Sequence, residues 1–436
     1  MGSSLGDTVR AIALEALATC SPEDAVRRVL QPIPSGARVG DRQWDGPFYV
    51  LSVGKAASAM ARAASDLLGN LVWAGSVLTR DGYSDEIPFM NCLEAGHPLP
   101  DARSLNATAD ILREIDALPD DVTILMLLSG GGSALFEAPD KGISLEDIRA
   151  VNAELLTCGA SIAEVNAVRK HLSRVKGGKL LRRISPRSSL ALVVSDVVGD
   201  DLATISSGPT VADHTTFADA VEVLKRRDLW GKTPKNVRHV LEEGLKGLRE
   251  ETLKSVEGYD TWAQVILDNR SLCRAAGEAA KIRGFTPLFL GSFFSGEARE
   301  IGTFVGEIAR EIRASKHPGP PPVAVISGGE SVVKVRGKGR GGPGQEAALA
   351  CARALRGLSG VAFLAMDSDG TDGPTDAAGG VVDGTTWDHM ESRGLNPLDA
   401  LERNDAYAVL GSGGGLWKTG PTGNNLNDLR ILLVEE

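Results

Sequence analysis

Short apolar runs alternate along the chain with longer stretches in which apolar residues recur at helical spacing. Each run is four to seven residues long, and almost all of them end at Gly, Ser or Asp. This alternation predicts an α/β fold in which helices cover both faces of a parallel sheet. The runs that predict strands are residues 48–53, 122–128, 190–195, 264–267, 286–291, 323–327 and 361–366.

The chain has 436 residues, which is too long for one ordinary core and predicts two domains. KHPGPPPV at 316–323 contains three successive prolines, which interrupt any helix and favour an extended linker. We therefore expect a linker at 317–322 between domains of residues 1–316 and 323–436. Each domain contains a similar strand-ending loop, SGGGS in the first and SGGES in the second. A cleft between the domains is the expected place for an active site.

The charge of the chain restricts its partners. The formal net charge is −10, which argues against a nucleic-acid partner. No apolar run is long enough to span a membrane, and the first ten residues lack the apolar core of a signal peptide. The five cysteines are scattered singly, which indicates neither a disulfide framework nor a zinc site. We expect a cytoplasmic protein with a small-molecule substrate, and the sequence leaves a homodimer open.

Two strand ends in the N-terminal half are typical of anion sites. Gly54 and Lys55 follow the run at 48–53 and precede an alanine-rich helix, where free N–H groups and the helix dipole attract anions. A solvated Lys beside a turn glycine is the alternative. The second candidate, which follows the run at 122–128, is a loop without Walker A spacing that either cradles phosphate or carboxylate or is a flexible turn. Its residues are Ser129, Gly130, Gly131, Gly132 and Ser133.

A basic segment and one aspartate add to these candidates. Arg169, Ser173 and Lys176 share one helical face that either binds a polyanion or is solvated. Asp196 stands just beyond the run at 190–195, where a carboxylate acts as a general base or metal ligand, or caps a helix.

The segment VVKVRGKGRGGPGQEAALA contains a GxGxxG pattern between a β-like run and a helix. Gly337, Gly339 and Gly342 match this pattern and predict a nucleotide loop, in which we select Gly337, Gly339 and Gly341 as binding residues. Lys338 and Arg340 make the loop resemble a cationic phosphate clamp more than a dinucleotide fingerprint.

Four aspartates follow the run at 361–366 in AMDSDGTDGPTDAAGG. An EF-hand would need Gly and Glu where Asp372 and Ala378 stand, so a calcium loop is excluded. A hydrated Mg²⁺ that bridges nucleotide phosphates fits better. We expect Asp367 and Asp369 to face the metal, and Asp372 and Asp376 to shape the turn and cap the next element.

Eight strings in order between Val9 and Val434 resemble the glycerate 2-kinase family with a C-terminal MOFRL domain. They are SVGKAASAM, AGHPLPDARS, LLSGGGSALFEAP, VNAVRKHLSRVKGGKL, VVSDVVGDDLATISSGPT, GRGGPGQEAALA, DSDGTDGPTDAAGG and TGPTGNNLNDL.

The resemblance implies phosphorylation of D-glycerate by ATP in a chain of two α/β lobes, the larger a Rossmann-like doubly wound sheet. It assigns catalysis to Lys55, Asp196 and Arg340. The family often has Asn where Gly344 stands, so we assign that position no role. The alternatives are an NAD(P)H-dependent hydroxypyruvate reductase, which the 337–342 glycines allow, and a noncatalytic acid-binding protein.

Overall fold

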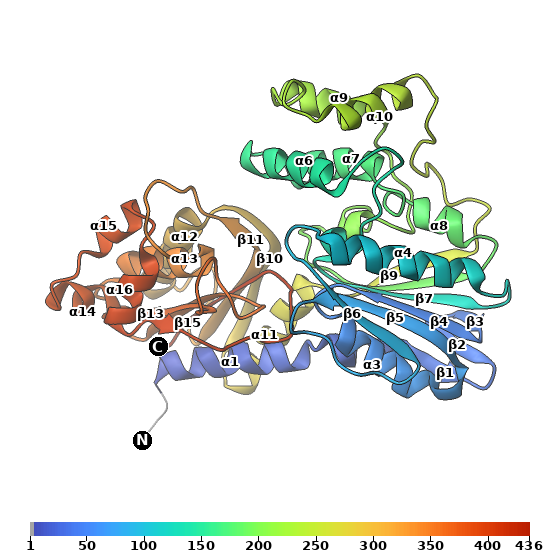
Figure 1. Cartoon of the computed structure of the whole chain (residues 1–436). Coiled ribbons are helices and arrows are strands. Elements are labelled where there is room, and N and C mark those ends of the chain that lie inside the picture. The colour runs from blue at the N-terminus through green and yellow to red at the C-terminus, as the bar shows by residue number, and fades with distance from the viewer. Residues whose placement is uncertain (1–3) are drawn as a thin grey trace. The chain divides into compact units, whose positions relative to one another are not determined.

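The computed structural model describes residues 4–436 and divides them into two compact units (Figure 1). One unit joins the residues up to Ser21 with Leu267–Glu436, and the other is Pro22–Ile266. The predicted linker at 317–322 lies inside the first of these units. The strands on its two sides, β10 (Thr286–Glu297) and β11 (Val323–Val332), pair in parallel, so residues 267–316 belong with the C-terminal domain. The compact units therefore do not follow the predicted boundary.

The 22–266 unit contains a six-stranded sheet with the order β6-β5-β4-β7-β8-β9. Its strands are β4 (Phe48–Val53), β5 (Val72–Arg80), β6 (Met90–Ala95), β7 (Thr123–Leu128), β8 (Ser189–Val194) and β9 (Thr261–Leu267). Each pairing from β6 to β8 is parallel. Numbered along the chain, this order reads 3-2-1-4-5-6, which is the Rossmann order and confirms the predicted doubly wound sheet. The order reverses between β4 and β7, where such a fold binds its ligand.

Helices cover both faces of this sheet. On one face α3 (Ala57–Leu68) packs on β4 and β5, with α2 (Pro22–Val29) beside it. On the other face lie α4 (Ala102–Ala117) and α8 (Lys179–Ile184) (Figure 1). Strands β4, β7 and β8 are buried at every residue, as expected for strands covered twice. A small antiparallel sheet of β1 (Gln31–Ile33), β2 (Gly36–Val39) and β3 (Arg42–Asp45) completes the N-terminal edge.

A separate helical layer of the same unit has its own hydrophobic core. It consists of α6 (Leu145–Thr157), α7 (Ile162–Leu172), α9 (Phe217–Arg226) and α10 (Lys235–Leu245) (Figure 1). Val151, Val168, Phe217 and Leu241 are buried at its centre. The short α5 (Gly132–Leu135) and the 3-10 turn η2 (Ile205–Ser207) lie between this layer and the sheet edge.

The other unit has a mixed sheet with the order β10-β11-β15-β12-β13-β14. Its remaining strands are β12 (Val361–Asp367), β13 (Gly379–Asp383), β14 (Leu416–Trp417) and β15 (Asp428–Val434). All seven predicted strands are present in the two sheets. The expectation of a purely parallel sheet is wrong here, because β15 lies between β11 and β12 and is antiparallel to both.

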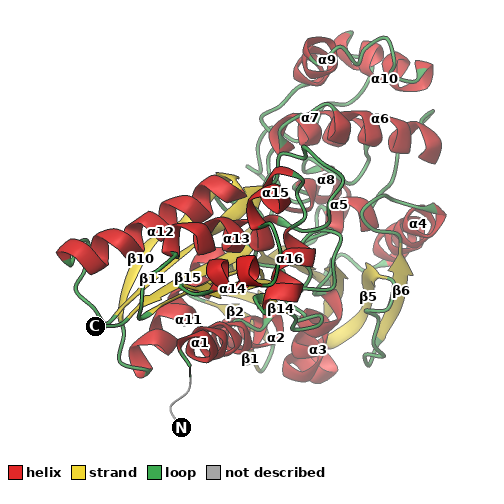
Figure 2. Cartoon of the chain, turned by 90° about the vertical axis from the view of Figure 1, so that its left-hand side faces the viewer, coloured by secondary structure: helices red, strands yellow, loops and turns green. Residues whose placement is uncertain are grey.

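Two pairs of helices cover this mixed sheet (Figure 2). On one face lie α1 (Leu5–Thr19) and α11 (Asn269–Ile282), and on the other α12 (Ala298–Ser315) and α13 (Pro343–Leu355). Three short helices follow β13, namely α14 (Thr386–Ser392), α15 (Pro397–Glu402) and α16 (Ala406–Gly413). Across residues 4–436, no helix combines the length and apolar character that a membrane crossing requires.

Candidate active site

Two glycine-bearing loops meet at the carboxyl ends of β4 and β7. The backbone N–H of Lys55 donates to the carbonyl of Gly130 at 2.8 Å, and the N–H of Ala56 donates to the Ser129 hydroxyl at 3.1 Å. The Ser129 N–H in turn donates to the carbonyl of Val53 at 2.9 Å. The two anion loops predicted from sequence are therefore neighbours at the point where the strand order reverses.

The glycines of these loops make the close approach possible. Gly54 has a φ of +127°, and a Cβ there would lie 2.5 Å from the carbonyl oxygen of Ser129. Gly131 has a φ of +89°, and its Cβ would lie 3.1 Å from the His97 ring and 3.5 Å from Cγ of Lys55. The Lys55 side chain and the His97 imidazole therefore both lie close to Gly131. Sequence reasoning assigned His97 no role, although it lies in one of the family strings.

A third loop, at residues 205–208, joins the site with two strained serines. The Ser206 hydroxyl donates to the carbonyl of Ser129 at 3.2 Å. The Ser207 hydroxyl lies 2.8 Å from that of Ser133 and donates to Oδ1 of Asn166 on α7 at 2.9 Å. Both Ser206 (φ +50°) and Ser207 (φ +60°) have left-handed backbone, which is unfavourable for Ser and is typical of functional sites. These two serines were missed because their residue type does not indicate positive φ.

Asp196 lies at the same sheet edge. It stands two residues beyond the end of β8, and β8 is parallel to β7 and next to it. The carboxyl ends of neighbouring parallel strands meet at one edge, so Lys55, the Ser129–Ser133 loop and Asp196 are gathered there. The edge therefore combines a cation, backbone N–H groups beside glycines and a carboxylate.

Lys176 and Arg169 differ from the prediction. Lys176 is 1% exposed, and its ammonium lies 2.6 Å from Oε2 of Glu137 and donates to the carbonyl of Phe136 at 3.2 Å. Burial lowers the pKa of Lys176, and the charge of Glu137 opposes this. Its ammonium thus has an internal partner and is not a free anion ligand. Arg169 donates through Nε to Oδ1 of Asn152 at 2.8 Å, and burial lowers the pKa of its guanidinium.

The glycines of the GxGxxG pattern serve packing within their own unit. A Cβ on Gly337 would lie 2.4 Å from the carbonyl oxygen of Arg403, and one on Gly339 would lie 2.6 Å from it. The N–H of Gly339 donates to the same carbonyl at 2.9 Å. Gly341 has room, since its nearest neighbour would be 3.5 Å away. Close contact with residue 403 explains Gly337 and Gly339 without a nucleotide.

The helix after this pattern is capped by an acidic side chain. The N–H groups of Gly344 and Gln345, in the first turn of α13, donate to the two carboxylate oxygens of Asp372 at 2.9 and 2.7 Å. In a dinucleotide-binding fold, the N–H groups at this place in the helix bind the pyrophosphate of the cofactor, whereas here they bind Asp372. Burial raises the pKa of Asp372 to about 7. Asp372 caps α13, which precedes it in sequence, rather than a later element as predicted.

Arg340 is held against the acidic loop of its own unit. Its Nε donates to the carbonyl of Pro374 at 3.1 Å, and its guanidinium lies 4.6 Å from the centre of the Tyr407 ring. Its backbone N–H donates to Oδ1 of Asp405 at 3.1 Å. The two Nη groups form no hydrogen bond with residues 4–436, so two donor groups remain for an anion.

Asp367 and Asp369 form a close acidic pair after β12. The Asp369 N–H donates to Oδ1 of Asp367 at 3.0 Å, and Oδ1 of Asp369 accepts from the N–H and hydroxyl of Thr371 at 2.8 and 2.7 Å. Burial, with the charge of Asp369, raises the pKa of Asp367. A divalent cation would relieve this repulsion. Within residues 4–436 no group of three or more His, Cys, Asp or Glu could hold a metal, so a Mg²⁺ at this pair would need waters and phosphate oxygens as its other ligands.

Asp376 bonds two side chains that follow it in the chain and caps no helix among residues 4–436, unlike the prediction. Its carboxylate accepts from the Tyr407 hydroxyl at 2.7 Å and pairs with the Lys418 ammonium at 2.8 Å. These contacts, led by that of Lys418, lower the pKa of Asp376 to about 2.

Comparisons with known proteins connect this geometry to a family. Residues 8–242 match the model described as "Domain of unknown function (DUF4147)", and residues 323–428 match the MOFRL family. A glycerate 2-kinase of Pyrococcus horikoshii is 42% identical over 96% of this chain and 95% of its own length. A D-glycerate 2-kinase of Thermotoga maritima is 43% identical over 88% of this chain and 90% of its own.

The crystal structure of a glycerate kinase from Thermotoga maritima has a TM-score of 0.88 and 39% identity, and covers 99% of both chains. A relative from Agrobacterium vitis, 39% identical over 99% of this chain and 95% of its own, has a provisional name as a hydroxypyruvate reductase. The matches to both family models and the similarity to the kinases along nearly the whole length are decisive. This chain belongs to the glycerate 2-kinase family, in which a DUF4147 domain is joined to a MOFRL domain.

Proposed function

We propose that this chain transfers the γ-phosphate of ATP to the 2-hydroxyl of D-glycerate and releases 2-phosphoglycerate and ADP. The observation that carries the proposal is the meeting of the Lys55 loop with the Ser129–Ser133 loop at the switch point of the Rossmann-like sheet. The names of the Pyrococcus and Thermotoga relatives support the substrate and the position phosphorylated.

Phosphoryl transfer depends on positioning and charge neutralisation more than on covalent chemistry. Asp196 accepts the proton of the 2-hydroxyl or orients it. Lys55 and Arg340 stabilise negative charge on the transferring group. The Ser129–Ser133 loop donates backbone N–H groups to the glycerate carboxylate or to phosphate oxygens. Asp367 and Asp369 would hold Mg²⁺, which neutralises charge on the ATP phosphates when bound.

A hydroxypyruvate reductase is the second candidate, favoured by the name of the Agrobacterium relative and by the 337–342 glycines. Against it stands Asp372, whose carboxylate accepts from the first-turn N–H groups of α13. In addition, β15 separates β11 from β12, so the pattern does not lie in the βαβ unit that binds a dinucleotide. The third candidate, a noncatalytic acid-binding protein, would turn over neither ATP nor NADPH.

The test is an assay with ATP, Mg²⁺ and D-glycerate, read through enolase alone. We expect signal without phosphoglycerate mutase, because enolase acts on the 2-phosphate. Signal only after the mutase is added would overturn the 2-position. NADPH oxidation with hydroxypyruvate, and no ATP-dependent signal, would establish the reductase instead. We also propose a cytoplasmic location, which is supported by five cysteines that form no disulfide within residues 4–436; the homodimer stays a prediction.

A further inference from the structure

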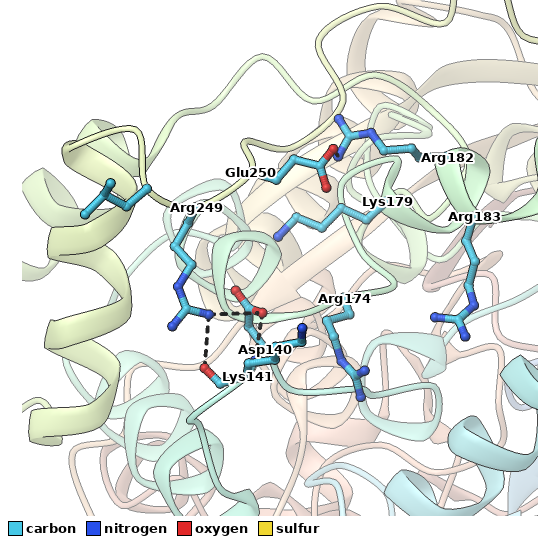
Figure 3. A pocket seen from close by; sticks show the side chains of 9 residues that line it. Asp140, Lys141, Arg174, Lys179, Arg182, Arg183, Arg249 and Glu250 are labelled. Carbon is cyan, nitrogen blue, oxygen red and sulfur yellow. Dashed lines mark hydrogen bonds and ion pairs between the residues drawn. The ribbon is translucent and has the colours of Figure 1, made fainter.

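A second polar cavity lies in the 22–266 unit and shares no residue with the switch-point site (Figure 3). Its volume is about 610 Å³, which is in the range of small-molecule sites. It is bordered by the loop after α5, the end of α7, helix α8 and the loop before β9. The lining residues are Asp140, Lys141, Arg174, Lys179, Arg182, Arg183, Leu248, Arg249 and Glu250.

The cavity has a strong positive charge in a protein whose net charge is −10. Six of its nine lining residues are basic and two are acidic. Three of the basic groups are neutralised locally. Arg249 pairs with Glu243 at 2.8 Å, Arg182 pairs with Glu250 at 2.8 Å, and Arg183 pairs with Asp116.

The other three cations, Lys141, Arg174 and Lys179, form no ion pair with any residue between 4 and 436. Arg174 donates only its Nε, to the carbonyl of Pro139 at 3.0 Å, which leaves its two Nη groups for a ligand. The carboxylates of Asp140 and Glu250 also line the cavity, but the six basic groups outnumber them, and an anion bound there would offset the excess positive charge.

Lys179 is the most constrained of the three. Its ammonium donates to the carbonyls of Ser173 at 2.8 Å and Lys170 at 3.2 Å, which uses two of its three N–H donors. Figure 3 shows this ammonium pointing into the open space that Arg249 and Arg182 also border. The two carbonyls hold the lysine in place, and its third donor remains for a ligand. Burial lowers the pKa of Lys179 to about 8, and a bound anion would raise it.

We propose that this cavity binds a phosphorylated small molecule with at least two negative charges. Guanidinium groups match phosphate oxygens with paired donors, and four arginines border the space together with two lysines that form no ion pair with residues 4–436. The volume of about 610 Å³ is the size of a site for a small molecule. The site is separate from the proposed kinase site and does not depend on the kinase reaction.

The experiment uses inorganic pyrophosphate and isothermal titration of the full chain. The parent and every variant compared with it carry Lys55→Ala, which weakens anion binding at the switch point. We expect this parent to bind pyrophosphate, and the addition of Arg174→Gln with Lys179→Gln to weaken binding about tenfold or more, since hydrogen bonds between charged groups are lost. The matched control is Arg113→Gln on α4, which removes one exposed positive charge outside the cavity and keeps the affinity.

Two results would overturn the proposal: no pyrophosphate binding by the Lys55→Ala parent when the unmodified chain binds it, or unchanged binding in the cavity variant. Thermal melting checks that the variants are folded. If Lys179→Gln unfolds the unit, Lys141→Gln replaces it, because Lys141 is exposed and its side chain forms no bond with residues 4–436. The replacement is judged by the same two results.

Discussion

The backbone N–H of Lys55 donates a hydrogen bond of 2.8 Å to the carbonyl of Gly130, which links the loops that follow β4 and β7. This bond sets the Lys55 backbone in place before any ligand arrives. A cation that is already positioned costs no reorganisation during the reaction, and that is the condition for effective charge stabilisation.

Lys55→Ala should lower turnover about 100-fold or more, because it removes the charge that we propose stabilises the transferring group. The measurement is kcat in the enolase-coupled assay, with unfolding temperature as a check of the fold. Lys225→Ala on α9 is the control for loss of a lysine, since its ammonium lies 5.7 Å from the centre of the Trp230 ring and has no other side-chain partner among residues 4–436. Near-normal turnover in the Lys55 variant would exclude a catalytic lysine.

Gly54→Ala should destabilise the 22–266 unit by about 2 kcal/mol or more, since the new Cβ would meet the Ser129 backbone and φ is +127°. Gly142→Ala separates the two causes. Gly142 also has positive φ (+91°), but a Cβ there would meet nothing within 4 Å. Urea unfolding should show a clearly smaller loss for the Gly142 variant, and equal losses would mean that the contact with Ser129 is unimportant.

Lys176→Met should cost about 3–5 kcal/mol, because Glu137 would keep a buried charge without a partner. Removal of both charges in Lys176→Met with Glu137→Leu should restore much of the stability. Oε1 of Glu137 is also buried without a hydrogen bond, which adds to the gain from its removal. A double variant as unstable as the single one would show that the pair matters for packing rather than charge.

Asp372 should make stability fall with rising pH. Its pKa is raised to about 7 in the folded chain, against an ordinary value of 3.8, so the folded state holds a proton that the unfolded state has lost. The contribution of Asp372 to the free energy of unfolding is complete below about pH 4 and is lost as the pH rises to about 7. Thermal unfolding of Asp372→Asn between pH 5 and 8 should lack this slope. Asp376→Asn should keep it, since the pKa of exposed Asp376 is about 2.

Asp369→Asn should raise the Mg²⁺ concentration for half-maximal activity roughly tenfold, because one carboxylate of the proposed metal pair is lost. The kcat at saturating Mg²⁺ should fall less. Asp388→Asn is the control for loss of a carboxylate. Asp388 lies on α14, where its carboxylate pairs with Arg356 at 2.6 Å. An unchanged Mg²⁺ dependence in the Asp369 variant would assign the metal to other groups.

Seven of the twelve strands in the two six-stranded sheets were predicted, because many buried strands are continuous apolar runs, whereas β5, β6, β13, β14 and β15 were not predicted. The arrangement in the mixed sheet could not be predicted, since β15 is inserted between β11 and β12 by long-range pairing that leaves no local pattern. The compact units differ from the predicted domains for the same reason. The proline run at 317–322 looks like a linker, but β10 and β11 pair across it.

The candidate site shows the same division between local and long-range signals. Glycines at strand ends pointed to Lys55 and the Ser129–Ser133 loop. The partner of Lys176 is 39 residues away, and the cap of α13 lies 28 residues beyond Gly344, so neither could be found from spacing. A serine pair in left-handed conformation has no signature in its residue type.

The unit with the mixed sheet is built from both ends of the chain. Helix α1 packs on α11, β12 and β15, and its last turn contacts the C-terminal segment through Asn424, whose amide donates to the carbonyl of Leu17 at 3.2 Å. During synthesis, α1 leaves the ribosome before the 22–266 unit, and its partners α11, β12 and β15 are made after that unit. All strands of the 22–266 unit are made before β12 and β15, so this unit can fold while the apolar face of α1 is still uncovered. Helix α1 is therefore separated in time from the strands on which it packs by the synthesis of the whole 22–266 unit.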